Sequence, residues 1–76
     1  MTQESTRRIA AHTIRWPDGS VMRMGVVTLV NGSVAEVNPL QGEQPFTEWL
    51  GGTIELRMTD NGQLAAYKND VKINRQ

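Results

Sequence analysis

The chain contains no cysteine and only four aromatic residues among its 76. The absence of cysteine excludes disulfide bonds and thiolate metal sites. A chain this short buries only roughly 60% of the surface that its unfolded form exposes, and so few aromatic side chains make a thin core. Good packing or self-association is then left to stabilise the fold, and we expect a homo-oligomer, with a dimer favoured.

The chain also lacks an excess of charge of either sign and a long apolar run. Eight Lys and Arg balance eight Asp and Glu, so the formal net charge is zero and the isoelectric point is near 6.5. No bulk field draws the protein to nucleic acid or an anionic membrane, and a near-neutral surface tolerates self-association. No apolar run approaches the ~18 residues of a membrane span, and residues 1–5 hold no signal-peptide core. We expect a soluble, cytoplasmic, bacterial protein without membrane contact.

What the chain does contain is a series of short, largely apolar segments separated by turn sequences. Asn31-Gly32 and Asn61-Gly62 are typical of tight hairpin turns, and Pro17-Asp18-Gly19-Ser20 suits a sharp reversal. Repeated reversals without a long amphipathic helix predict an all-β fold, a small antiparallel meander of five to six strands forming a roll or barrel-like sheet. The expected strands are residues 7–16, 21–30, 33–38, 53–58, 63–68 and, as a short sixth, 71–74.

Polarity predicts where the domain begins. Residues 1–6 are polar and offer nothing to bury, so we expect a disordered N-terminal tail. Residues 7–76 then make a single β domain. Within it, residues 39–45 form a connection, because two Pro and a Gly in that stretch suit no regular element.

The segment 46–56 combines large apolar side chains, a glycine pair and the start of a strand. Phe46, Trp49 and Leu50 are spaced i, i+3, i+4, which predicts one short helical turn near residues 46–50. Gly51-Gly52 should end that turn, because Gly accepts a positive φ without a Cβ clash. Trp49 is expected to be the largest piece of the core. The predicted structural anchors are Phe46, Trp49, Leu50, Gly51 and Gly52.

Residues 21–30 form the most apolar stretch, with apolar side chains at both odd and even positions. This pattern predicts a central strand covered on both faces, with Gly25 marking a bulge or bend. One small sheet covers one face, and a second copy is the simplest cover of the other, so we predict a two-fold dimer with its axis near Met24 and Val26. The alternative is a rolled monomer in which both faces are internal. The hypothetical interface consists of Met22, Met24, Val26 and Val30.

Two consecutive segments carry a family resemblance: residues 14–20, with the sequence IRWPDGS, and residues 25–37, with the sequence GVVTLVNGSVAEV. They resemble the opening β segment of amidohydrolase-type metalloenzymes, in which two such hairpins build a small β domain beside a barrel. The match covers about a third of the chain and implies a β-roll shape. The His-x-His metal motif and the barrel of that family are missing here, so no hydrolase activity carries over. The whole chain is also similar to short uncharacterised β proteins of bacterial genomes.

Few residues are candidates for chemistry. His12 is the only histidine, so no two-histidine metal site exists. Glu43 and Glu48 are interpreted as solvated charges, and Gly51-Gly52 lacks the Lys and Ser/Thr of a phosphate loop. We therefore expect no catalytic residue, no metal and no cofactor, and a protein that is not an enzyme.

Two functions from different classes remain open. The favoured one is a non-enzymatic, self-associating interaction or scaffolding module, which could also bind an unknown protein. The alternative is a small β-barrel that binds single-stranded nucleic acid, although the zero net charge counts against it. In that alternative a base stacks on Trp16 or Tyr67, and the phosphates contact Arg7, Arg8, Arg15 and Arg23.

Overall fold

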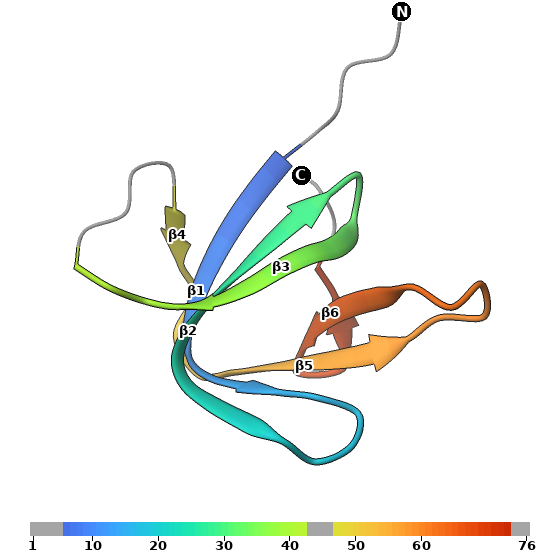
Figure 1. Ribbon diagram of the computed structural model, residues 1–76, viewed down its shortest axis with the longest axis horizontal. Coiled ribbons are helices and arrows are strands. Elements are labelled where there is room, and N and C mark those ends of the chain that lie inside the picture. The colour runs from blue at the N-terminus through green and yellow to red at the C-terminus, as the bar shows by residue number, and fades with distance from the viewer. Residues whose placement is uncertain (1–5, 43–46, 74–76) are drawn as a thin grey trace, which may run out of the picture.

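The computed structural model describes residues 6–42 and 47–73, which consist of strands and turns (Figure 1). The predicted all-β class is confirmed, although β4 brings the strands to seven instead of five or six. In the described part of the chain, no helix has the length and apolar character to cross a membrane. The strands are β1 Thr6–Arg15, β2 Val21–Val30, β3 Ser33–Pro39, β4 Thr47–Trp49, β5 Thr53–Met58, β6 Leu64–Lys68 and β7 Val71–Lys72.

The strands form one mixed sheet in the order β3-β2-β1-β5-β6-β7, with β4 also paired to β1. β1 is antiparallel to β2 but parallel to both β4 and β5, so the predicted antiparallel meander is wrong. Turn sequences indicate where the chain reverses, but they do not indicate which strand it joins after a longer connection. The sheet curls until Ser33 Oγ donates to Gln63 Oε1 at 2.9 Å, but β3 and β7 remain its edges, so it does not close into a barrel.

Residues 47–49 form strand β4 in place of the predicted helical turn. Thr47 and Trp49 pair with Arg8 and Ala10 in parallel register. The N–H of Leu50 then donates to the carbonyl oxygen of Ala10 at 2.9 Å. Pairing with an existing strand satisfies main-chain groups that a single helical turn leaves unpaired. The first residue of the predicted turn, Phe46, lies outside the described residues.

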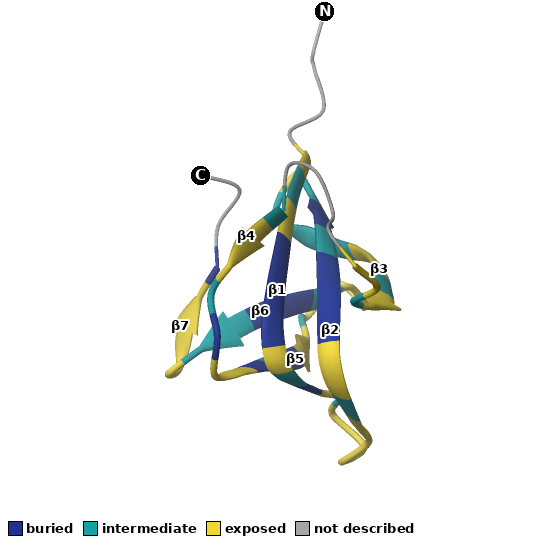
Figure 2. Ribbon diagram, turned by 90° about the vertical axis from the view of Figure 1, so that its left-hand side faces the viewer, coloured by how far each residue is buried: buried dark blue, intermediate teal, exposed yellow. Residues whose placement is uncertain are grey.

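The core lies inside the curl of the sheet, where the central stretches of β1 and β2 are buried (Figure 2). Its members come from β1, β2, β5 and β6 and from one residue beyond β7. Because the chain has few aromatic residues, aliphatic side chains fill this core. The core consists of Ile9, Ala11, Ile14, Val27, Leu29, Ile54, Leu56, Ala66 and Ile73.

The side of β1 that faces the core reverses partway along the strand. Ile9 and Ala11 are buried at odd positions, whereas Ile14 is buried at an even one. Between them neither His12 nor Thr13 is buried. Two successive residues turned away from the core exchange the inner and outer faces of a strand, because side chains alternate with a period of two.

β2 makes the same change at the same level, and an exposed band crosses both strands there (Figure 2). Val27 is buried in the core and Met22 packs against it, whereas Arg23 and Met24 between them are exposed. Met24 has a φ of 55°, a left-handed value that is rare for a residue with a Cβ. The bend predicted from Gly25 therefore lies at the neighbouring residue, Met24.

Both faces of β2 are covered, as its apolar pattern predicts: Val27 is 0% exposed and Val26 is 3% exposed. Val26 and its β1 partner Ala10 are buried but lie outside the core cluster, on the outer face of the sheet. Leu40 and Trp49 lie beside Ala10 on this outer face. The same chain thus covers the second face at these positions, where a second subunit was expected.

We expect Gly25→Ala to destabilise the fold by about 1–3 kcal/mol, because overpacking a closely packed site forces neighbours to move. A Cβ at this position would lie 2.7 Å from Ile14 Cγ1 and 3.1 Å from Met22 Sδ. Urea denaturation would measure the loss. As a control, the change should be smaller in an Ile14→Ala background, since the clashing atom is then absent. Equal losses in the two backgrounds would contradict this packing role.

Candidate interaction surface

Trp49 does not anchor the core. Its side chain is 51% exposed, so the predicted role as the largest core piece is wrong. The cause is the parallel pairing with Ala10, which places Trp49 on the outer face of the sheet. Leu50 is partly buried and packs against the core. The indole of Trp49 is therefore available at the surface on a paired strand.

Gly51 and Gly52 have φ values of 71° and 64°, so both adopt the positive φ that the sequence predicts. They turn the chain from β4 into β5, rather than ending a helix. The carbonyl oxygen of Gly52 accepts from the N–H of Thr13 at 3.1 Å, and Lys68 Nζ donates to the carbonyl oxygen of Leu50 at 2.9 Å. Backbone and side-chain bonds thus hold this kink against β1 and β6.

His12 completes the kink, a role that the sequence analysis missed. The N–H of Gly52 donates to His12 Nδ1 at 3.1 Å. The ring of His12 also meets the indole of Trp49 edge-on, with 4.8 Å between ring centroids and 80° between planes. An aromatic pair of this geometry orients both rings. The bend in β1 therefore fixes the position of Trp49. Residues 12, 49 and 52 are too far apart in the sequence for a local pattern to predict that they meet.

Met24 and Leu40 lie near this pair on the outer face of the sheet. Met24 lies opposite His12, between the paired positions Ala11–Gly25 and Thr13–Arg23. The N–H of Leu40 donates to the carbonyl oxygen of Met24 at 2.8 Å, which extends the pairing beyond the end of β3. We call Trp49, His12, Met24 and Leu40 the outer strip.

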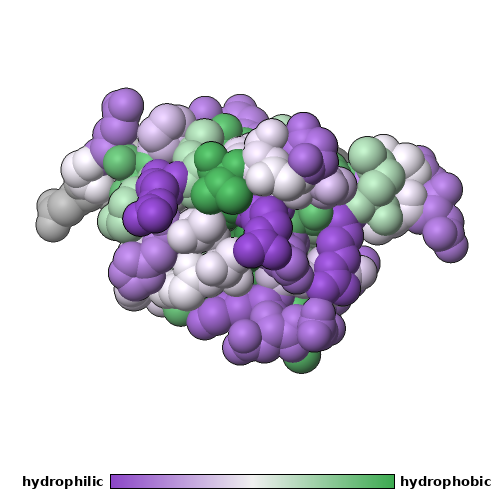
Figure 3. All heavy atoms as spheres, turned by 90° about the horizontal axis from the view of Figure 1, so that it is seen from below, coloured by the Kyte–Doolittle hydropathy of each residue, from purple (hydrophilic) through white to green (hydrophobic). Residues whose placement is uncertain are grey.

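The outer strip differs from the other exposed apolar residues, which are scattered. Val21, Met58 and Val71 are more than half exposed and lie on three different strands. On the face seen in Figure 3, hydrophobic side chains show as separate spots among hydrophilic ones. Single exposed apolar side chains are ordinary, whereas contiguous ones mark interaction sites.

The predicted interface residues do not form one exposed surface. Met24 is 42% exposed and belongs to the outer strip. Val26 is buried within the chain, Met22 packs against the core, and Val30 is half-buried. The prediction assumed a regular alternation along β2, and the reversal at Met24 separates these four side chains.

The four arginines of the nucleic-acid alternative are dispersed. Arg7 and Arg15 bind the carboxylates of Glu48 and Glu55, at 2.7 Å and 3.4 Å. Arg8 and Arg23 are exposed at different levels of β1 and β2.

In that alternative a base would stack on Trp16 or Tyr67, and each of these two rings already contacts another part of the chain. Trp16 is partly buried and packs against the core. The guanidinium of Arg57 lies 4.5 Å from the ring centre of Tyr67. With both rings occupied and the arginines dispersed, the alternative gains no support from this arrangement.

Arg7 and Glu48 form a bidentate pair that joins β1 to β4. Arg7 Nε lies 2.7 Å from Glu48 Oε1, and the second pair, Arg7 Nη2 and Glu48 Oε2, is 3.1 Å apart. Hydrogen bonding to Arg7 holds the pKa of Glu48 below its ordinary value. This pair lies next to Trp49 in sequence and helps to keep β4 on the sheet.

We expect Glu48→Gln to weaken the dependence of stability on acid pH. A carboxyl whose pKa is depressed by folding adds stability above its unfolded pKa, and that stability is lost as the pH falls through the folded value. The free energy of unfolding should therefore drop more steeply below about pH 4 in the wild type than in Glu48→Gln. Denaturation at a series of pH values would measure this. Glu36→Gln serves as the control, and parallel curves for wild type and Glu48→Gln would contradict the expectation.

No protein-family model matches the chain, and no curated protein or solved structure matches it. The resemblance to the β domain of amidohydrolases remains a prediction. Within residues 6–42 and 47–73, no group of three or more His, Cys, Asp or Glu side chains could hold a metal ion. Glu43 lies outside the described residues. A functional interpretation therefore rests on the surface of the sheet.

Proposed function

We propose that this protein is a non-enzymatic interaction module that associates with a second copy of itself through the outer strip. The observation that carries the proposal is the exposure of Trp49 and Met24 on the two strands that pair with β1, on either side of His12. Trp and Met are enriched in protein interfaces, and a rigid strand presents them with little loss of entropy. The zero net charge supports self-association, since identical copies then repel one another weakly.

The order of side chains in the strip supports a two-fold arrangement. Trp49, His12 and Met24 stand on three neighbouring strands, β4, β1 and β2, which are about 4.8 Å apart in a sheet. An axis between His12 and Met24, lying in the plane of the face, places the outer strips of the two copies against each other. The same rotation places His12 against Met24. Isologous contacts of this kind are the commonest in homo-oligomers.

The type of residue at position 24 gives a second reason. A non-glycine residue at positive φ costs about 1–2 kcal/mol, and such residues cluster at functional sites. Met24 keeps this conformation inside a strand and is still 42% exposed, so core burial does not account for its side chain. A binding role would explain why methionine occupies a position that suits glycine. Four side chains bury a small area, so we expect reversible association rather than a permanent dimer.

Substitutions in the strip should dissociate the protein without unfolding it. We expect Met24→Glu and Trp49→Ala to sediment as the 8.5 kDa monomer at concentrations where the wild type shows a dimer. Trp49→Ala should cost well below about 3 kcal/mol of stability, since the indole is half exposed rather than in the core. Sedimentation velocity over a series reaching millimolar concentration would measure the association.

The matched control is Met58→Glu, because Met58 is 60% exposed but lies outside the strip. It should associate as the wild type does. A wild type that remains monomeric through the whole series would refute self-association. Equal effects of Met24→Glu and Met58→Glu would place the contact elsewhere.

Met24→Gly should separate association from stability. Glycine relieves the positive φ but adds entropy to the unfolded chain, so the free energy of unfolding should stay within about 1 kcal/mol of the wild type. The dimer should nevertheless weaken, because the side chain is gone. Thermal unfolding and sedimentation on the same samples would test both halves. Undiminished association would show that the Met24 side chain takes no part.

A further inference from the structure

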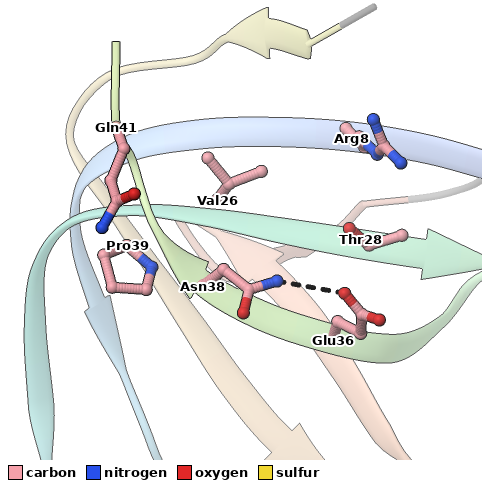
Figure 4. A pocket seen from close by; sticks show the side chains of 7 residues that line it. All are labelled: Arg8, Val26, Thr28, Glu36, Asn38, Pro39 and Gln41. Carbon is pink, nitrogen blue, oxygen red and sulfur yellow. Dashed lines mark hydrogen bonds between the residues drawn. The ribbon is translucent and has the colours of Figure 1, made fainter. Parts of the chain in front are cut away.

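A second feature of the outer face is a polar hollow of about 370 Å³ over β1, β2 and β3. One row of the sheet crosses it, with Arg8 paired to Thr28 and Thr28 paired to Glu36. Figure 4 shows Arg8 and Glu36 on opposite sides of Thr28. The hollow is lined by Arg8, Val26, Thr28, Glu36, Asn38, Pro39 and Gln41.

The two ends of this row carry opposite charges that do not neutralise each other directly. Arg8 is exposed and forms no ion pair with a described carboxylate. Glu36 Oε1 accepts from Asn38 Nδ2 at 3.0 Å, and this bond orients the carboxylate (Figure 4). Since one strand lies between β1 and β3, the two charged residues are attached about 10 Å apart.

This arrangement selects the charge of a ligand. A simple anion attracted by Arg8 would be repelled by Glu36. A simple cation attracted by Glu36 would be repelled by Arg8. A molecule that carries both charges at matching separation satisfies both ends, and like-charge contact excludes the others. Between the ends, the Thr28 hydroxyl and the amides of Asn38 and Gln41 supply polar contacts, and Val26 provides an apolar floor.

We propose that the hollow binds short zwitterionic peptides, with the terminal carboxylate on Arg8 and the terminal ammonium on Glu36. Arginine is suited to a carboxylate because its planar fork donates two parallel hydrogen bonds. An extended peptide of three residues spans about 10 Å, which matches the spacing of the two strands that carry Arg8 and Glu36, and both side chains are long enough to adjust to it. The main-chain amides of the peptide would lie over Thr28 and Asn38. Because the site is open to water, binding should be weak.

The experiment is a titration of the wild-type protein with triglycine, followed by amide chemical shifts. We expect saturable shifts at Thr28 and Asn38. Two matched probes remove one charge each: acetyl-triglycine lacks the ammonium, and triglycine amide lacks the carboxylate. Each should bind at least about tenfold more weakly, as expected when a charge-assisted hydrogen bond is lost.

Charge-removing variants assign the ends of the peptide. Arg8→Gln should bind triglycine and triglycine amide equally, and Glu36→Gln should bind triglycine and acetyl-triglycine equally. Arg23→Gln, an exposed arginine outside the hollow, is the control and should bind as the wild type does. Absence of saturable shifts, or equal binding of all three peptides by the wild type, would overturn the proposal.

The hollow and the outer strip can be tested separately. Met24→Glu lies outside the lining of the hollow and should leave peptide binding unchanged. Arg8→Gln should likewise leave self-association unchanged. Loss of peptide binding in Met24→Glu would show that the hollow does not act as an independent site.

Discussion

The structure depends on the point at which β1 and β2 exchange their inner and outer faces. A single sheet of this size must curl to enclose a core, and a regular strand keeps the same side chains facing inward. Turning two successive residues outward, His12 with Thr13 and Arg23 with Met24, lets the hairpin bend and still present Ile14 to the core. The positive φ of Met24 is the backbone cost of that bend.

The kink between β4 and β5 is complementary to this bend. Gly51 and Gly52 adopt positive φ, and the N–H of Gly52 donates to the ring of His12, which the bend has turned outward. β1 can therefore pair with β4 along one half and with β5 along the other. The same geometry brings Trp49 beside His12 and leaves Trp49 exposed on the outer face. The proposed outer strip therefore depends on how the sheet bends to close the core.

Much of the local structure could be predicted from the sequence. The Asn31-Gly32 turn has both residues at positive φ, and the tight turn after Trp16 is closed by a hydrogen bond from Gly19 N–H to Trp16 O at 3.0 Å. The alternation of apolar and polar residues predicts β5. The apolar residues at both odd and even positions of β2 predict that both of its faces are covered. These features depend on residues near one another in the chain, where steric preference and periodicity decide the outcome.

The site was less predictable because it joins distant segments. The spacing of Phe46, Trp49 and Leu50 favours a helical turn, but residues 47–49 pair with β1, and pairing satisfies more main-chain groups than one turn can. The partners of His12, namely Trp49 and Gly52, are about forty residues away. The predicted dimer interface assumes that side chains alternate regularly between the two faces of β2. The positive φ of Met24 interrupts this alternation.

The sequence by itself determined the fold class, the hairpin turns and the apolar content of the core, since each depends on local preference or composition. Tertiary structure alone decided that β1 is central, that Val26 is covered by its own chain, and that Trp49 is exposed. It also decided that Arg8 and Glu36 lie across one hollow. The physical reason is that strand pairing at long range chooses between registers of similar local energy, and the choice sets which side chains meet.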